Sequence, residues 1–324
     1  MSGLALLGIT MSLVMIKTRN NTLVFPIAMG GAAIGSCSSK IFFGKPISNI
    51  EAVRTVLYAL ENGVNLFDTS PFYGNSEYKI GLAIQEYGNR ESFIISTKVG
   101  TSPQFKGYSA DLFMRSIDES LHLLRVDYLD IVHIHDPDEQ DFETMLGKNG
   151  GMEVMLKLKE QGVIRYIGLG VRKHSLHHKF INTGMADVIL PYLDYNLINQ
   201  SATNLLEQAK EKKVGVLLGS PLCMGLLSGT DPRQIYISHY DIANEISTSR
   251  ASEIYQWCLS KAINVMALNF NFILKNNSID ALLVGVSSPE EIISCLHAYR
   301  EQISTEMMDE FWTWFNKEGM PLTT

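Results

Sequence analysis

Short runs of apolar residues recur along the chain and alternate with longer stretches that have helical spacing. Each run holds four or five residues and is nearly continuous, with little polar alternation. Runs of this kind are typical of parallel strands that are covered on both faces. The sequence therefore predicts eight buried strands, at residues 64–67, 93–96, 129–132, 166–169, 187–190, 214–218, 264–267 and 281–284.

The stretches between the runs place apolar residues on one face of a helix. In residues 48–61, Ile50, Val53, Leu57 and Leu60 recur with helical spacing, and the pattern predicts further helices at 111–125, 152–161, 200–212 and 250–262. Alternating strands and helices favour a closed barrel or an open doubly wound sheet. A dinucleotide-binding open sheet would carry a GxGxxG turn after its first strand, and this chain has none. We therefore expect an α/β fold of the (β/α)₈ TIM-barrel type.

The segment before the first run predicts an N-terminal β-hairpin that covers the barrel bottom. Its strands would span residues 11–18 and 22–29, on either side of a turn at Arg19, Asn20 and Asn21. Residues 2–16 are apolar and uncharged, but they lack the basic region and cleavage site of a signal peptide. They are also fewer than the roughly 20 residues of a spanning helix, so a signal or anchor is the alternative to the hairpin. No linker divides the chain, and we expect one domain over residues 1–324.

Composition and charge exclude some classes of function for this chain. Apolar residues make up 46% of the chain and charged residues 19%, which indicates a large buried core. The formal net charge of −7 argues against a nucleic-acid partner, because such proteins carry basic surfaces. The four cysteines form no CxxC pair and fit a reducing, cytoplasmic location. We expect no membrane association.

Polar side chains gather where three successive predicted strands end. Asp68 ends one strand and Tyr73 follows in its loop, Lys98 ends the next, and a histidine at position 133 or 135 ends the third. In a barrel the carboxyl ends of the strands form the functional face. Each residue alone has an ordinary structural explanation, such as a helix cap, a packed ring or a solvated amine. Their convergence on one rim indicates a catalytic site.

This set of residues suits hydride transfer to or from a carbonyl carbon. A tyrosine, whose pKa is ordinarily near 10, becomes a better proton donor and acceptor beside a lysine cation. A carboxylate can hold that lysine in place, and a neutral histidine can orient the substrate oxygen. The chemistry requires no metal. His174 and His177 form an HxxH pattern, which is poor zinc spacing without a third ligand, so we expect no metal site. Residues 231–247 form either a lid over a cofactor or a surface excursion.

At these residues the chain resembles the aldo-keto reductases. The resemblance covers roughly residues 25–300 and rests on segments that occur in the family's order. They are residues 65–82 (NLFDTSPFYGNSEYKIGL), 96–100 (STKVG), 127–138 (DYLDIVHIHDPD), 162–168 (GVIRYIG), 219–229 (GSPLCMGLLSG) and, less closely, 284–291 (VGVSSPEE). Around the tetrad, the sequence of these segments is most similar to the branch of D-threo-aldose, L-fucose and L-galactose dehydrogenases.

The resemblance implies a catalytic tetrad and a nicotinamide cofactor, either NAD or NADP, with a small carbonyl or sugar as substrate. The tetrad falls on Asp68, Tyr73, Lys98 and His135, and His133 becomes a packed residue on the same strand face. The implied cofactor contacts are Asp68, Gly170, Tyr192, Gly219, Ser220, Pro221, Leu222, Gly285, Ser287 and Glu291.

Some cofactor positions depart from the family pattern. Gly170, Val171 and Arg172 stand where many members have Ser-Asn, Tyr192 replaces a glutamine, and Cys295 replaces an asparagine that contacts adenine. Because no cation occupies positions 285–288 or 291, we expect NAD(H) to bind at least as readily as NADP(H). The alternative function is a catalytically weak or inactive dinucleotide-binding protein on the same scaffold.

Overall fold

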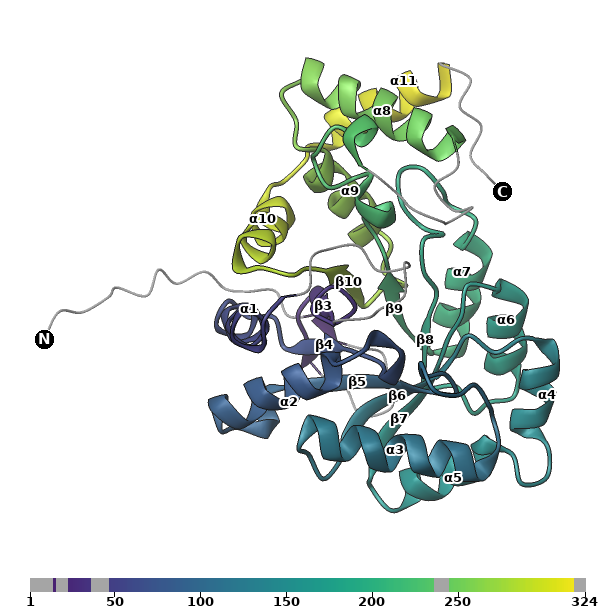
Figure 1. Cartoon of the computed structure of the whole chain (residues 1–324). Helices are drawn as coiled ribbons and strands as arrows, with labels where there is room; N and C mark the ends of the chain where they lie inside the picture. The colour runs from purple at the N-terminus through teal and green to yellow at the C-terminus, as the bar shows by residue number, and fades with distance from the viewer. Residues whose placement is uncertain (1–13, 16–22, 36–46, 236–244, 318–324) are drawn as a thin grey trace, which may run out of the picture.

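Eight parallel strands close into a barrel in the computed structural model, which describes residues 14–15, 23–35, 47–235 and 245–317 (Figure 1). The strands are hydrogen-bonded in the order β10-β3-β4-β5-β6-β7-β8-β9, which confirms the predicted fold class. They are β3 (Ile27–Gly30), β4 (Leu66–Asp68), β5 (Ile94–Val99), β6 (Leu129–His135), β7 (Ile164–Gly170), β8 (Val188–Leu190), β9 (Gly215–Gly219) and β10 (Ala281–Gly285).

One predicted strand was wrong, and another segment takes its place in the barrel. Residues 264–267 begin helix α9 (Val265–Leu274), whose first turn is capped by the Asn264 side chain, which accepts from the backbone N–H groups of Met266 and Ala267. This helix is apolar on nearly all sides and buried, so its first residues have the same apolar pattern as a buried strand. The eighth strand is β3, which the prediction had placed in the hairpin.

The described part of the N-terminal hairpin is antiparallel, as predicted. Val14–Met15 (β1) pairs with Leu23–Val24 (β2), and the predicted turn between them lies outside the described residues. Asn65, immediately before β4, ties β2 to the barrel, because its amide donates to the Leu23 carbonyl. Val24 is fully buried in the inner apolar cluster with Leu66 and Ile94. The hairpin strand therefore packs against the end of the barrel where the strands begin.

Helices cover the outside of the barrel, and all five predicted helices are present within a few residues of their expected limits (Figure 1). The apolar spacing did not single out the other six helices of the described residues, at 76–87, 139–146, 174–182, 265–274, 289–300 and 305–317. The helices are α1 (Asn49–Glu61), α2 (Ser76–Tyr87), α3 (Ala110–Leu124), α4 (Glu139–Leu146), α5 (Gly151–Glu160), α6 (His174–Asn182), α7 (Thr203–Lys212), α8 (Glu245–Ser260), α9, α10 (Pro289–Arg300) and α11 (Thr305–Lys317).

Apolar side chains form an inner core within the barrel and further clusters outside it. The inner cluster takes alternate residues from the strands, such as Ile131 and Leu217, as expected when every second side chain points inward. A separate cluster joins α8 and α11, where Trp257 stacks on Trp314 with ring centroids 5.6 Å apart. In the described residues, no single helix is long and apolar enough to cross a membrane; one pair, Ser247–Ser260 and Val265–Leu274, passes by length and composition together but is bent by 107°.

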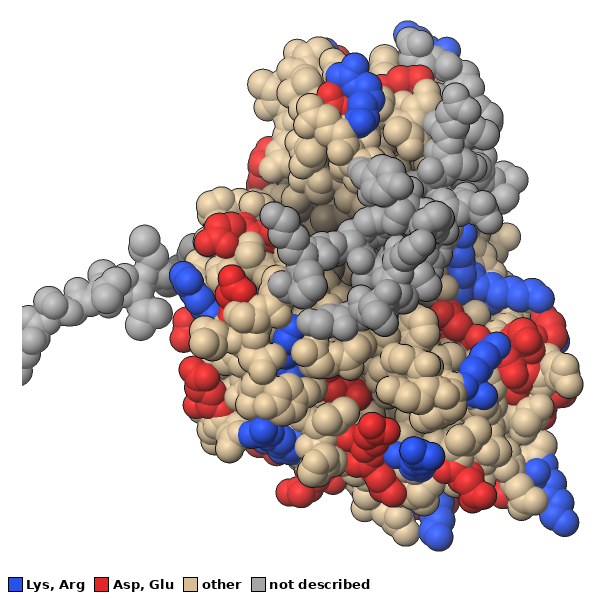
Figure 2. All heavy atoms as spheres, viewed as in Figure 1, with Lys and Arg blue, Asp and Glu red and all other residues tan. Residues whose placement is uncertain are grey.

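Charged residues on the face shown in Figure 2 are mixed in sign. Lys and Arg side chains lie among Asp and Glu side chains over the barrel helices, and the visible described residues gather into no extended basic patch. This distribution agrees with the net charge of −7.

The strands are linked in pairs near the end where they begin. An Asp or Asn at or just before the start of one strand accepts a hydrogen bond from a backbone N–H of the preceding strand or its approach. The four links are Phe25 N to Asn65 Oδ1 (2.9 Å), Ile95 N to Asp130 Oδ2 (2.9 Å), Ile167 N to Asp187 Oδ2 (2.9 Å) and Val216 N to Asp280 Oδ2 (2.7 Å).

Asp130 carries the most heavily bonded of these links. Besides Ile95, its buried carboxylate accepts from Arg90 at 2.7 Å and from Arg165 at 2.8 Å. Both guanidinium groups stack on the Tyr128 ring, 4.2 and 4.1 Å from its centroid. The carboxylate thus joins β5, β6 and β7 in one network.

We expect Asp130→Ala to destabilise the protein by about 3–5 kcal/mol, because it leaves a buried N–H and two cations without their acceptor. Asp127→Ala, at an exposed position three residues earlier, is the matched control and should change stability by less than about 0.5 kcal/mol. Urea unfolding followed by circular dichroism measures both. Equal midpoints for the two variants would contradict a stabilising role for the network.

Candidate active site

A buried ion pair lies at the centre of the candidate site. Asp68 is the last residue of β4 and Lys98 is in β5, and their exposed fractions are 3% and 2%. The Lys98 ammonium contacts Asp68 Oδ2 and donates to the Thr69 carbonyl at 2.7 Å. Ser96 donates to the other carboxylate oxygen of Asp68 at 2.7 Å. Both charges are therefore hydrogen-bonded, as a buried pair requires.

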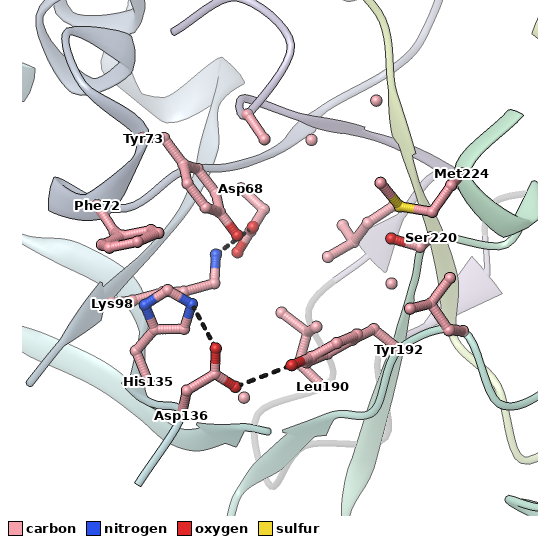
Figure 3. Close-up of a pocket in the computed structure, with 17 residues that line it drawn as sticks. Asp68, Phe72, Tyr73, Lys98, His135, Asp136, Leu190, Tyr192, Ser220 and Met224 are labelled. Carbon is pink, nitrogen blue, oxygen red and sulfur yellow. Dashed lines mark hydrogen bonds and ion pairs between the residues drawn. The ribbon is translucent and has the colours of Figure 1, made fainter. Parts of the chain in front are cut away.

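Tyr73 lies over this pair. It ends a 3₁₀ turn, Pro71–Tyr73, whose start is fixed by Pro71 and by the Ser70 hydroxyl, which accepts from the Phe72 N–H at 3.1 Å. The Lys98 ammonium is 4.7 Å from the centroid of the Tyr73 ring. In Figure 3 the Tyr73 side chain extends into the pocket, next to the Asp68–Lys98 pair. A cation this close favours the phenolate form of a tyrosine.

His135 completes the group of predicted catalytic residues. It is the last residue of β6, and its ring is 6.0 Å from the Tyr73 ring, centroid to centroid. Burial, and then the charge of Lys98, hold the pKa of His135 well below its usual value. The imidazole is therefore neutral near pH 7. Its Nδ1 contacts the hydroxyls of Thr101 and Ser70, and its Nε2 is 3.5 Å from Asp136 Oδ2.

His133 lies deeper in the barrel, on the same strand face as His135. It is fully buried, and Gly168 makes room for it, since a Cβ there would lie 2.2 Å from Nδ1 of His133. Burial, and then the Lys98 charge, hold the pKa of His133 well below its usual value. Neither ring nitrogen has a hydrogen-bond partner among the described residues. The structure thus places His133 inside the barrel, as expected of a packed residue.

The tetrad and most of the predicted cofactor residues line one pocket at the carboxyl ends of the strands (Figure 3). On the side that faces the tetrad the lining includes Gly170, Tyr192, Gly219, Ser220 and Gly285. Two of these are glycines next to which protein side chains already pack, since a Cβ at Gly219 would lie 2.8 Å from the Tyr192 Cβ and one at Gly170 would lie 3.7 Å from the His133 Cβ. A methyl group at Gly285 would meet no protein atom within 4 Å, so the space beside it is open. The residues present therefore fit a ligand that passes close to the Gly285 backbone, as a nicotinamide cofactor bound in this pocket would.

The remaining predicted cofactor residues lie beyond the pocket lining. Leu222 packs against the core, and the Pro221 carbonyl accepts from the Asn269 amide at 3.0 Å. Ser287 and Glu291 bond to each other at the start of α10. Cys295 is buried, and burial raises the pKa of its thiol to about 12.

Arg172, which stands where many members of the family have Ser-Asn, takes part in a charged cluster. Its guanidinium is 3.2 Å from Asp194, whose buried carboxylate also contacts His174 at 3.1 Å. The other histidines of the HxxH segment bond elsewhere, His177 to the Val171 carbonyl and His178 to Gln208. In the part of the chain that the structure describes, no group of three or more potential ligands could hold a metal ion.

Sequence reasoning missed several residues that shape the pocket. Asp136 has a left-handed backbone (φ 44°), and its carboxylate accepts from the Tyr192 hydroxyl at 3.1 Å, which joins the two sides of the pocket (Figure 3). Burial raises the pKa of Asp136. Thr101 holds the His135 ring, and Met224 adds a thioether to the lining. Asp136 directly follows His135 in the sequence. This position next to a predicted tetrad residue was the signal from which a place in the pocket could have been predicted.

Relatives of known activity match nearly the whole chain. An L-galactose dehydrogenase from Arabidopsis thaliana is 32% identical over 295 residues, which cover 89% of this chain and 88% of the relative. A D-arabinose 1-dehydrogenase from Saccharomyces cerevisiae is 28% identical over 294 residues, covering 85% and 83%.

Solved structures agree on the fold. A glycerol dehydrogenase from Gluconobacter oxydans superposes with a TM-score of 0.78 at 22% identity and covers 98% of each chain. The profile of the aldo/keto reductase family matches residues 26–312, which include every strand of the barrel and all four tetrad positions. The chain is therefore a nicotinamide-dependent oxidoreductase that belongs to the aldo/keto reductase family.

Proposed function

We propose that this protein oxidises the anomeric carbon of an aldose, in its cyclic lactol form, to the lactone, with Asp68, Tyr73, Lys98 and His135 as the catalytic group. The observation that carries the proposal is the buried Lys98 ammonium, which lies between the Asp68 carboxylate and the Tyr73 ring. The sugar substrate is supported by the relatives named L-galactose dehydrogenase and D-arabinose 1-dehydrogenase.

Each member of the tetrad has a distinct task in this mechanism. A nicotinamide cofactor held in this pocket, beside Tyr192 and Gly285, would supply the hydride acceptor for the anomeric carbon. Tyr73, whose ring centroid is 4.7 Å from the Lys98 ammonium, accepts the proton of the anomeric hydroxyl as base, and it returns a proton in the reverse direction. Asp68 holds Lys98 in position. Neutral His135 donates a hydrogen bond to the substrate oxygen and so fixes its orientation.

Water exclusion strengthens these interactions. Asp68, Lys98 and His135 are all buried, so the charges act in a medium of lower dielectric constant than water. The donors and charges are held before the substrate arrives, because Ser96 donates to Asp68, the Thr69 carbonyl accepts from Lys98, and the Thr101 hydroxyl contacts His135. Such preorganisation reduces the reorganisation needed in the transition state.

Replacing Tyr73 with phenylalanine should lower kcat by 10²–10⁴-fold, a typical loss for general acid–base catalysis, because the ring stays but the proton carrier is gone. The dissociation constant of the dinucleotide should change little. Tyr87→Phe, on an exposed ring at the end of α2, is the matched control. Steady-state absorbance of the reduced nicotinamide gives the rates, and near-normal turnover in Tyr73→Phe would refute the mechanism.

The substrate class can be tested with a panel of sugars and aldehydes. We expect kcat/KM for at least one aldose, assayed as lactol oxidation, to exceed that for reduction of simple aromatic aldehydes. The same preparation should be assayed in both directions at one pH. A rate with aromatic aldehydes far above that with every aldose would instead indicate a general aldehyde reductase.

The start of α10 supports use of NAD(H) at least as readily as NADP(H). The Glu291 carboxylate accepts from the N–H and hydroxyl of Ser287, at 2.6 and 3.0 Å, and the Ser288 hydroxyl accepts from the Glu291 N–H at 3.3 Å. A carboxylate therefore occupies the helix terminus that would otherwise attract a phosphate. The cation Arg300 lies at the opposite end of α10. It is therefore about 16 Å along the helix axis from the first residue of the helix.

We expect wild-type protein to bind NAD⁺ at least as tightly as NADP⁺, and Glu291→Gln to improve NADP⁺ binding relative to NAD⁺ by roughly threefold or more through loss of like-charge repulsion. Glutamine preserves the helix cap. Glu290→Gln removes the adjacent charge, which faces Arg54, and is the control. Quenching of tryptophan fluorescence measures both affinities. Wild-type binding of NADP⁺ more than about tenfold tighter, or about 1.4 kcal/mol, would contradict the assignment.

A further inference from the structure

A short hairpin after β5 packs against His135 from outside the tetrad. Thr101 pairs with Lys106 in an antiparallel bridge, and the Gly107 N–H donates to the Gly100 carbonyl at 2.9 Å. The hairpin continues into Tyr108, whose hydroxyl donates to the His135 carbonyl at 2.7 Å. The segment therefore contacts both the backbone and the ring of His135.

The hairpin is fixed at both of its ends. Gly100 has a left-handed backbone (φ 100°), and the Tyr108 ring fills the space where a Cβ would stand, 2.5 Å away. A side chain at position 100 would therefore be disfavoured both by the left-handed backbone and by contact with the Tyr108 ring. Lys106 binds Asp141 in the first turn of α4 at 2.8 Å. These contacts hold Thr101 at a defined place above the imidazole.

The neutral imidazole of His135 has two possible tautomers, and only one suits the proposed role. A proton on Nε2 lets the ring donate toward the pocket, whereas a proton on Nδ1 leaves a lone pair there. Nδ1 contacts the Thr101 hydroxyl and is 3.5 Å from the Ser70 hydroxyl. The Ser70 oxygen already accepts from the Phe72 N–H, so its own proton is available to donate.

The surroundings of Nε2 point to the same tautomer. Asp136 Oδ2 is 3.5 Å from Nε2, and its partner Oδ1 accepts from Tyr192. A lone pair on Nε2 would face this carboxylate and be repelled, while an N–H would be attracted. Hydroxyl donors on one side of the ring and a carboxylate on the other thus favour a proton on Nε2.

We propose that Thr101 is a positioning residue that donates to Nδ1 of His135 and thereby selects the tautomer whose Nε2–H binds the substrate oxygen. This inference rests on the role proposed above for His135. Thr101 touches neither substrate nor cofactor in this scheme and acts only through the imidazole.

The test compares Thr101→Val, which keeps the shape but loses the hydroxyl, with Thr101→Ser, which keeps the hydroxyl. Loss of one hydrogen bond of ordinary strength should lower kcat about tenfold in the valine variant, with dinucleotide affinity unchanged. The serine variant should retain nearly wild-type kcat. Thr144→Val, at an exposed site in α4, controls for the substitution itself.

A second readout does not depend on turnover. Two-bond ¹H–¹⁵N correlation spectra of the imidazoles distinguish the tautomers, and loss of one spin system in His135→Gln assigns the signal. The wild type should show the Nε2–H form, and Thr101→Val should show a mixture or the Nδ1–H form.

The possible failures can be told apart. If no sugar or carbonyl turns over, the proposed function fails, but the spectra still test the tautomer. If the wild type carries the proton on Nδ1, or if Thr101→Val keeps both wild-type kcat and a pure Nε2–H signal, the inference is overturned. It is also overturned if the serine and valine variants lose the same activity.

Discussion

The proposed chemistry of this protein depends on keeping one ammonium and one carboxylate together out of contact with water. Burying two charges is costly, and their attraction offsets that cost only when the remaining hydrogen-bonding positions are filled. Here Ser96 and the Thr69 carbonyl fill positions on Asp68 and Lys98. The same buried cation lies beside the Tyr73 ring and helps keep His135 neutral. One ion pair thus acts electrostatically on both groups that are proposed to contact the substrate oxygen, and for His135 it adds to the larger effect of burial.

The sequence predicted the features that follow from periodicity and from residues at strand ends. Seven of the apolar runs are barrel strands, and the four side chains expected on one rim line one pocket. The run at 264–267 was misread because a short run with three apolar residues cannot distinguish a strand from a buried helix. The pairing of β10 with β3 closes the barrel between segments more than 250 residues apart, and no local pattern reports such a contact.

The cofactor side of the pocket was less predictable than the catalytic side, for a physical reason. Tyr73 and Lys98 can be recognised in the sequence by side chains of distinctive chemistry, whereas Gly285 leaves open space because it has no side chain. Sequence also could not show that Glu291 is engaged by its own helix terminus, or that Arg172 is paired with Asp194. Thr101 was missed because its role depends on a left-handed glycine and a tyrosine seven residues later.

The side-chain links at the amino ends of the strands have a consequence for how the barrel is divided. They span the β3–β4, β5–β6, β7–β8 and β9–β10 junctions, and the Arg165–Asp130 contact adds a tie between β6 and β7. None of these links spans the junction between β4 and β5, which we call a seam. Asp68 and Tyr73 belong to the β3–β4 pair, and Lys98 and His135 to the β5–β6 pair. The Asp68–Lys98 ion pair therefore bridges the seam between β4 and β5 at the opposite end of the strands. An opening of that seam would separate Asp68 and Tyr73 from Lys98 and His135, so the geometry of the proposed tetrad depends on the closure of the barrel.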